Sequence, residues 1–285
     1  FSYWQAFRRS WRDEWYGATA MKNCLYLNSF EAYLKTLRHD GPGIYLYENQ
    51  PWELALISSW RRYTTEKLFA VPHSTVRYWD TRVLANLAEI CRGSNPDSLP
   101  SPDVFATNGP VMASVFEQFG CSSGNVASVE ALRFTRLAVE GVHSRSRDQP
   151  ILVLGEYSQL QTDTILNQVI AATKGTSFHD RIRFRSHPAL GQNLPAKYRG
   201  LQVDESATAV DAIRKASVVV CGSLSSSAVE SMLLGKPTFL VPDAEVLTSS
   251  PAEALGPTWA IDLHQELRQA LVGEVRTPDD AHPLS

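Results

Sequence analysis

Apolar runs of four or five residues alternate along this chain with longer segments whose apolar positions recur at helical spacing. In the second half, the apolar run 151–154 precedes a helical pattern over 162–173, which precedes a strand-like run over 181–185. Strands that alternate with helices are typical of a parallel sheet covered by helices on both faces. The pattern therefore predicts an α/β fold.

The predicted elements follow this alternation through both halves. Strands are expected at 44–47, 67–71, 103–107, 126–129, 151–154, 181–185, 200–203, 217–220 and 237–241. Helices are expected at 52–63, 111–119, 162–173, 207–215, from the serine run near 225 to about 234, and at 263–271. The residues after Gly273 are expected to be disordered.

A polar, charged segment without periodicity spans 143–150 and ends in Pro150, as an interdomain linker does. It divides the chain into an N-terminal Rossmann-like domain over 1–145 and a C-terminal Rossmann-like domain over 150–285. Two such domains are expected to face a cleft, with ligands beyond the carboxyl ends of the strands.

The first residues combine aromatic side chains with arginines. Four aromatic residues recur at helical spacing and three arginines lie among them, namely Trp4, Phe7, Trp11 and Trp15 with Arg8, Arg9 and Arg12. The preferred interpretation is a helix that packs this stripe on the domain, and the alternative is a helix that lies on a membrane surface. Because residue 1 is not Met, we interpret the chain as the interior of a longer polypeptide.

The composition argues against several classes of protein. A net charge of −3 over 285 residues gives no electrostatic reason to expect nucleic acid as a partner. No apolar run is long enough to span a bilayer, and residues 1–20 do not form a signal peptide. The four cysteines are widely spaced without a C-x-x-C pair, which argues against a zinc site or a disulfide framework and favours a reducing compartment.

The segment 221–230 is the most informative candidate for ligand binding. An apolar strand ends near Gly222, and a helix begins through the hydroxyl residues Ser223, Ser225, Ser226 and Ser227. Free backbone N–H groups at the start of a helix bind anions, and Glu230 one turn later can accept hydrogen bonds from ribose hydroxyls. The alternative is a serine that caps an ordinary helix, with Glu230 near position N3 in a capping box.

Two further strand ends in the second half carry candidate ligand-binding residues. Pro188 directs the chain as it leaves a strand, so that the imidazole of His187 can donate to a phosphate oxygen or, equally, bond a nearby carbonyl. Gly155 allows a ligand to approach closely, and Glu156 can bind a hydroxyl. Neither a G-x-G-x-x-G nor a P-loop sequence occurs, which argues against a dehydrogenase-type or P-loop nucleotide site.

The first half contributes candidate residues at its own strand ends. Glu48 is the preferred general base and His73 the second candidate. Four further polar residues are candidates for binding the acceptor or the sugar, namely Asn49, Gln50, Arg77 and Asn108. A surface salt bridge is the alternative for Arg77.

Taken together, these strings resemble a known family. His187-Pro188 followed by Ser225-Ser226-Ser227-x-x-Glu230 is similar to the HP and serine motifs of GT-B glycosyltransferases that use CMP-activated acidic sugars, such as bacterial sialyltransferases and Kdo transferases. The strings 45–53, 72–80, 108–109 and 129–134 resemble a family of bacterial surface-carbohydrate biosynthesis. The resemblance covers residues 40–245, and because its first half is short for a GT-B domain, a truncated N-terminal domain is expected.

The resemblance implies a metal-independent, inverting transfer of a Kdo-like or sialic-acid-like sugar from a CMP donor to a surface glycan, such as capsule or lipopolysaccharide. It implies no cofactor beyond the donor substrate, and no Asp-x-Asp sequence that would hold a metal occurs. The implied partners are the nucleotide-sugar donor and a glycan or glycolipid acceptor. The resemblance places the acceptor on the side of the domain over 1–145 and makes the domain over 150–285 the nucleotide-sugar-binding one. The expected location is the cytoplasm, with peripheral contact at the inner face of the cytoplasmic membrane as a further expectation.

Two other functions stay open at this point. A GT-B enzyme that uses a UDP- or GDP-sugar, or a UDP-sugar 2-epimerase-like enzyme, would use the same strand ends. A non-catalytic GT-B-like module of a larger assembly protein would keep the fold without the base.

Overall fold

The computed structural model describes most of the chain up to residue 243. The described residues are 4–37, 41–73, 99–131, 134–138, 149–191 and 196–243, with Val76, Val83, Leu87, Glu89, Ile90, Cys91 and Leu194. They form two compact units, and the chain passes from the first to the second after Ala131. We call them unit 1 and unit 2. The predicted linker at 143–150 and the predicted helix at 263–271 lie almost wholly outside the described residues.

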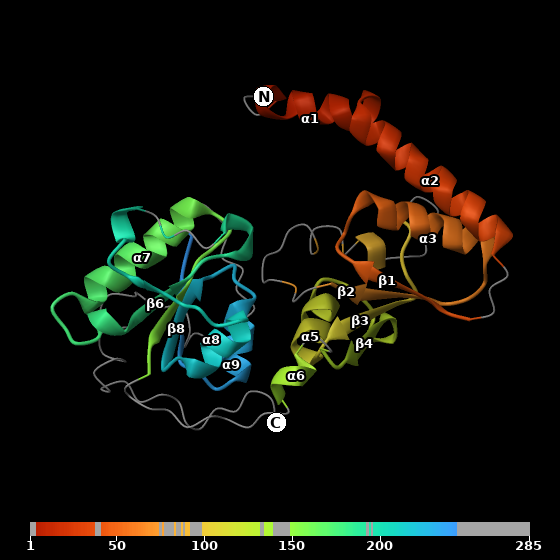
Figure 1. The fold of residues 1–285 in the computed structure, drawn as a ribbon. Coiled ribbons are helices and arrows are strands. Elements are labelled where there is room, and N and C mark those ends of the chain that lie inside the picture. The colour runs from red at the N-terminus through yellow and green to blue at the C-terminus, as the bar shows by residue number, and fades with distance from the viewer. Residues whose placement is uncertain are drawn as a thin grey trace. The chain divides into compact units, whose positions relative to one another are not determined.

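Unit 1 is built on a four-stranded parallel sheet in the order β1-β2-β3-β4 (Figure 1). Its strands are β1 (Gly43–Tyr47), β2 (Leu68–Pro72), β3 (Val104–Asn108) and β4 (Val126–Val129). The elements beside the sheet are α3 (Pro51–Tyr63), α5 (Pro110–Gln118) and the 3-10 turn η1 (Ser123–Asn125). Tyr47 lies opposite Pro72, and Asn108 lies opposite Val129. The strands therefore end at one common edge of the sheet.

Aromatic rings fill the core of unit 1. Tyr47 and Phe116 each pack edge to face against Phe105, with ring centroids 5.3 Å apart in both pairs. At the opposite edge of the sheet, Asp103 accepts a hydrogen bond from the Leu68 N–H at 2.7 Å and pairs with Arg61 at 2.9 Å. The carboxylate thus holds the starts of β2 and β3 beside the end of α3.

Unit 2 carries a five-stranded parallel sheet in the order β7-β6-β5-β8-β9. Its strands are β5 (Ile151–Leu154), β6 (Ile182–Arg185), β7 (Gln202–Val203), β8 (Val218–Gly222) and β9 (Thr238–Val241). Its helices are α6 (Thr135–Ala138), α7 (Gln159–Thr173), α8 (Ala209–Lys215) and α9 (Ser227–Leu233), with 3-10 turns η2 (His179–Arg181), η3 (Pro188–Leu190) and η4 (Ala196–Tyr198).

Helices cover both faces of the unit 2 sheet, which explains why its strands are apolar without alternation. Ile151 and Val153 of β5 pack in a cluster with α7, whereas Leu152 and Leu154 pack on the other face in a cluster with α8 and α9. Figure 1 shows α7 on one side of this sheet and α8 and α9 on the other. Parallel strands buried on both faces have this composition.

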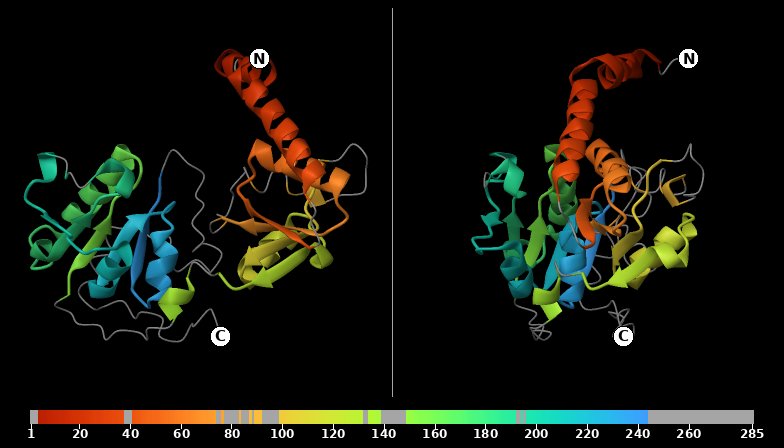
Figure 2. Two further views of the ribbon diagram at one scale, coloured as in Figure 1. Left: turned by 45° about the vertical axis from the view of Figure 1, so that its right-hand side comes forward. Right: turned by 90° about the vertical axis from the view of Figure 1, so that its right-hand side faces the viewer.

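Two helices precede the unit 1 sheet, α1 (Trp4–Tyr16) and α2 (Ala18–Thr36) (Figure 2). The end of α2 packs against α3, where Glu31 pairs with Arg62 at 2.9 Å and the Lys35 ammonium lies over the Tyr63 ring. The aromatic stripe of α1 does not pack on the domain as the preferred interpretation of the sequence had it. The exposed fractions of Trp4, Phe7, Trp11 and Trp15 lie between 49% and 61%.

The predicted strands are all present, with ends that differ by at most two residues. Helix α7 begins three residues earlier than predicted, because the Ser158 hydroxyl accepts the Gln161 N–H at 3.4 Å and caps it. Helix α2 was not predicted, since its apolar residues form no continuous stripe. The argument against a disulfide was wrong, because Cys91 and Cys121 are bonded to each other.

Two features concern a possible membrane span and a possible metal site. Among the described residues, no helix has both the length and the apolar composition needed to cross a bilayer. The same residues contain no cluster of three or more His, Cys, Asp or Glu side chains placed to hold a metal ion.

Gly43 at the start of β1 tests the packing of unit 1. A Cβ atom there would lie 2.6 Å from the Trp60 ring and 2.8 Å from a Leu68 methyl group, both of which are buried. Gly43→Ala is expected to lower the free energy of unfolding by about 1–3 kcal/mol, because core atoms must shift. Urea denaturation followed by tryptophan fluorescence measures the change. Gly41→Ala is the control, since a Cβ there meets nothing within 4 Å, and equal midpoints for the two variants would contradict the packing.

Candidate functional site

Polar residues follow the strands of both units at the carboxyl edge of each sheet. In unit 1 these are the residues after β1, β2 and β3, and in unit 2 they are the residues after β5, β6 and β8. In open α/β sheets this edge is where ligands bind. Each edge is described below as a separate cluster.

The acid–base candidates of unit 1 lie together. The Nδ1 atom of His73, after β2, is 3.4 Å from a carboxylate oxygen of Glu48, after β1, and both side chains are largely exposed. The backbone N–H of His73 donates to the Tyr47 carbonyl at 3.1 Å, which fixes the end of β2 beside the end of β1. A carboxylate beside an imidazole can orient the ring and stabilise its protonated form, so the pair suits proton abstraction.

A buried carboxylate shapes the turn that carries Glu48. One oxygen of Glu53 accepts the backbone N–H groups of Glu48 and Gln50, each at 2.8 Å, and the Glu53 side chain is 2% exposed. Its other oxygen is buried without a hydrogen-bond partner among the described residues. Asn49 between the two donors has φ 58°, in the left-handed region that Asn tolerates. Burial raises the pKa of the Glu53 carboxyl.

The acceptor candidates of unit 1 differ in their placement. The Asn108 amide donates to the Pro72 carbonyl at 3.3 Å and so joins the ends of β3 and β2. Asn49 and Gln50 lie in the turn after β1, where Gln50 is exposed and Asn49 half-buried. Arg77 lies outside the described residues.

In unit 2, a direct bond joins the ends of β5 and β8. A carboxylate oxygen of Glu156 accepts the Gly222 N–H at 3.0 Å, and a Cβ at position 222 would lie 2.5 Å from that oxygen. Gly155 donates its N–H to the Arg185 carbonyl at 2.8 Å, so the end of β6 is tied in as well. Burial, with Glu156 nearby, raises the pKa of the Cys221 thiol, so this buried cysteine is not a nucleophile at neutral pH.

His187 stands at the end of β6 with one ring nitrogen already used. Its Nδ1 accepts the Ala189 N–H at 3.2 Å where Pro188 begins the η3 turn. In the neutral ring the proton is therefore on Nε2, which is left to donate to a ligand. The Tyr157 ring lies edge-on to the imidazole, with centroids 5.8 Å apart, and Tyr157 is 72% exposed.

The serine segment does not form the capping box that was the alternative interpretation. The N-cap of α9 is Ser226, which makes no side-chain cap bond, and Glu230 falls one position beyond N3. The Glu230 side chain is 6% exposed, and its ribose contact stays a prediction. The Ser223 side chain is 3% exposed, and its hydroxyl has no partner among the described residues. Ser225 and Ser227 are half-buried.

Sequence reasoning missed two residues of these clusters. Tyr157 follows Gly155-Glu156 directly, so its place at a strand end was a usable signal. Glu53 lies inside a predicted helix, and a single sequence does not show that its carboxylate turns back into the strand–helix turn. The charge of Arg185, at the end of β6, is already neutralised within unit 2. Its guanidinium pairs with Asp204 at 2.7 Å and donates to the Ser206 carbonyl.

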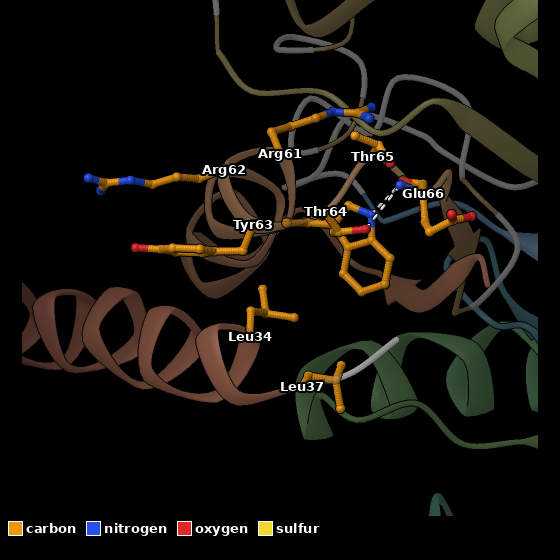
Figure 3. A pocket seen from close by; sticks show the side chains of 9 residues that line it. Leu34, Leu37, Arg61, Arg62, Tyr63, Thr64, Thr65 and Glu66 are labelled. Atoms are coloured by element: carbon orange, nitrogen blue, oxygen red, sulfur yellow. Dashed lines mark hydrogen bonds between the residues drawn. The ribbon is translucent and has the colours of Figure 1, made fainter. Parts of the chain in front are cut away.

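Two hollows in the described part of the chain lie away from these clusters. One of about 480 Å³ is lined by the ends of α2 and α3 and by the turn that enters β2, from Leu34 to Glu66 (Figure 3). The Trp60 indole donates to the Glu66 carbonyl at 2.7 Å at its wall. This hollow borders the amino-terminal edge of the sheet, opposite the strand ends. The second, about 580 Å³, borders the joint of α1 and α2 at Arg9, Arg12 and Tyr16.

Comparison with known proteins identifies the fold. The sequence matches no family model and no curated protein. The structure resembles Acinetobacter baumannii MurG (TM-score 0.54, 13% identity, 91% of this chain and 71% of that one). It also resembles Staphylococcus aureus MnaA solved with UDP (0.51, 13%, 87% and 69%) and TarM (0.51, 10%, 87% and 51%). At this identity the likeness shows the fold alone, and it confirms the predicted α/β fold of GT-B type.

The buried charge of Glu53 gives a pH-dependent prediction. The pKa of Glu53 in the folded state lies above the unfolded value near 4.5. The protonated carboxyl therefore stabilises the folded protein fully below the unfolded pKa, and this stabilisation is lost as the pH rises through the folded-state pKa. Glu53→Gln keeps an oxygen acceptor without the charge, so its stability relative to wild type is expected to increase from about pH 4 to pH 7. Urea denaturation across this range measures the difference.

Glu53→Ala is the control for the hydrogen bonds of the turn. It leaves two N–H groups without their acceptor and is expected to be about 1–3 kcal/mol less stable than Glu53→Gln at every pH, because neither variant titrates at this position. A Gln variant that loses stability relative to wild type as the pH rises would contradict the assignment.

Proposed function

We propose that this chain is a glycosyltransferase of GT-B type, in which unit 2 binds a nucleotide-sugar and unit 1 supplies the base that activates an acceptor hydroxyl. One observation carries the proposal. Three neighbouring strand ends of unit 2 are joined through Glu156 on Gly222 at 3.0 Å and Tyr157 beside His187. They bring a free ring nitrogen, an exposed aromatic ring and a buried hydroxyl to one edge.

These groups suit a nucleoside phosphate. The Nε2–H of His187 donates to a phosphate oxygen, and the Ser223 hydroxyl supplies a second donor from the end of β8. The exposed Tyr157 ring offers a surface on which a base or sugar can stack. Because Asp204 takes up the charge of Arg185 at the end of β6, the described residues at these three strand ends leave little positive charge for a second phosphate. This supports a CMP-linked acidic sugar as the donor.

The proposed reaction assigns one role to each cluster. The acceptor oxygen attacks the anomeric carbon and forms the new glycosidic bond while the bond from that carbon to the phosphate oxygen breaks. CMP leaves with the electron pair, and donors around the phosphate stabilise its growing charge. The acceptor proton passes to the Glu48–His73 pair. A single displacement of this kind inverts the anomeric configuration, and the acceptor class is a glycan or glycolipid.

A UDP-sugar is the second candidate donor, favoured by one specific observation. The MnaA structure that shares this fold contains UDP. The location proposed for either donor is the cytoplasm. The Cys91–Cys121 disulfide weakens the cysteine-based argument for a reducing compartment, so the proposed location rests on the use of a nucleotide-sugar donor alone.

Nucleotide binding tests unit 2. CMP is expected to raise the melting temperature of the protein, since a ligand at a hundred times its Kd adds about 2.7 kcal/mol of stability. His187→Ala is expected to weaken CMP binding roughly tenfold or more, through loss of a hydrogen bond to a charged group. Thermal shift and calorimetric titration with CMP, CDP, UDP and GDP measure both effects.

His179→Ala is the matched control, because His179 belongs to the same unit but lies before β6, at the other edge of the sheet. Stabilisation by UDP and not by CMP would change the proposed donor to a UDP-sugar and leave the proposed enzyme class unchanged. Binding of none of the four nucleotides would contradict the proposal. CMP binding without turnover would favour a non-catalytic module.

Turnover tests the base. Glu48→Gln and His73→Ala are each expected to lower kcat by about 10²–10⁴-fold while leaving CMP affinity unchanged, because general-base catalysis acts on the acceptor proton. Release of CMP from CMP-Kdo and CMP-N-acetylneuraminate with glycan acceptors measures the rate. Glu117→Gln, an exposed carboxylate on α5, is the control. Full activity in both base variants would show that another group takes the proton.

A further inference from the structure

The aromatic stripe of α1 is an apolar surface that the described part of the chain leaves exposed. Its four side chains, Trp4, Phe7, Trp11 and Trp15, follow one face of the helix and are each about half exposed or more. Trp11 lies against both of its tryptophan neighbours, with ring centroids 6.2 Å from Trp4 and 5.7 Å from Trp15. The rings therefore form a continuous ladder along about three turns of helix.

Arginines lie along one edge of this ladder. Arg8 stands one turn after Trp4 and Arg12 one turn after Arg8, both exposed and without an ion-pair partner in the described part of the chain. Of the two acidic residues of α1, Asp13 lies on the opposite side of the helix and Glu14 on the other edge of the ladder. The stripe is thus flanked by positive charge on the side of Arg8 and Arg12.

Hydrogen bonds fix the connection between α1 and α2. Asp13 accepts hydrogen bonds from the Ala18 N–H at 3.0 Å and from the Thr19 hydroxyl, so its carboxylate caps the start of α2. These bonds lower the pKa of Asp13. The Met21 N–H donates to the Gly17 carbonyl at 3.2 Å, so the hydrogen bonding of α2 begins directly at the joint. Helix α1 is therefore held at a defined angle to α2, as Figure 2 shows.

We propose that α1 lies in the surface of an anionic phospholipid membrane, with its tryptophans at the level of the headgroups and Arg8 and Arg12 on lipid phosphates. A helix with one aromatic face, a charged remainder and low overall hydrophobicity binds in the interface plane rather than across the bilayer. Tryptophan favours this depth because its ring is apolar and its N–H remains hydrated. The inference does not depend on the proposed enzymatic function.

Charge complementarity distinguishes this occupant from a second copy of the chain. Each arginine close to an anionic surface adds to the attraction, whereas the core of a protein–protein interface is depleted in charged residues. Arg8 follows Phe7 directly and Arg12 follows Trp11, so a protein partner that covered the stripe would also have to neutralise both guanidinium groups. A lipid surface supplies that counter-charge everywhere.

Vesicle flotation of the whole 285-residue chain tests the proposal. Wild-type protein is expected to float with vesicles of phosphatidylglycerol and phosphatidylethanolamine and to bind phosphatidylcholine vesicles more weakly. Replacing Trp4, Trp11 and Trp15 together by Ala is expected to lower partitioning roughly a hundredfold or more, because the buried apolar area is lost. Arg8→Gln with Arg12→Gln is expected to lower binding to the anionic vesicles roughly tenfold and to remove most of its salt dependence.

Leu160→Ser is the matched control, since Leu160 is a 64% exposed apolar side chain in unit 2, and it is expected to float like wild type. Circular dichroism and thermal unfolding verify that each variant is folded. Wild-type protein that stays in the bottom fraction of the gradient, or a folded tryptophan variant that floats equally well, would overturn the proposal. Dimers in sedimentation velocity that the tryptophan variant abolishes, without vesicle binding, would instead assign the stripe to self-association.

Discussion

Parallel pairing of every strand is the constraint on which the rest of this structure depends. It forces the carboxyl ends of four strands in unit 1 and five in unit 2 to one edge of each sheet. Glu48 and His73 are far apart in the sequence, yet they meet at 3.4 Å because β1 and β2 run side by side in the same direction. Gly155 and Gly222 are brought together in the same way by β5 and β8.

In both units a carboxylate accepts backbone N–H groups at the edge where the strands end. Where a strand ends, its next N–H groups lose their ladder partners and need other acceptors. In unit 1, Glu53 accepts two of them and holds the turn that carries Glu48. In unit 2, Glu156, which follows β5, accepts the Gly222 N–H at the end of the neighbouring strand β8. Only a residue without a side chain at position 222 leaves room for it, since a Cβ there would lie 2.5 Å from that carboxylate.

The fold followed from the sequence because each strand is short, apolar and bounded by Gly, Pro or polar residues. The site followed in part, since strand ends can be located without knowing which strands are neighbours. The predictions that failed concern contacts with residues or surfaces that the local sequence does not indicate. Helix α2 has one residue that is buried, Leu34, so it carries no periodic signal. The packing of the α1 stripe was predicted wrongly because its own pattern says only that one face is apolar, and not whether a protein surface covers it. The Cys91–Cys121 bond joins cysteines whose separation by 30 residues gives no local indication of contact.

The distribution of exposed apolar side chains separates the two units. Among the described residues, unit 2 exposes few large apolar groups, and one of these, Tyr157, belongs to the candidate nucleotide site. Unit 1 exposes the α1 ladder and also Ile44 and Leu46, at 73% and 55%, on its edge strand β1. Apolar surface left in water is unfavourable, so patches of this kind mark interaction surfaces in stable proteins. In the proposed function, unit 2 binds a small charged nucleotide, which has no need of such surface, whereas unit 1 meets a glycan or glycolipid acceptor. This asymmetry therefore supports assigning the nucleotide to unit 2 and the acceptor to unit 1.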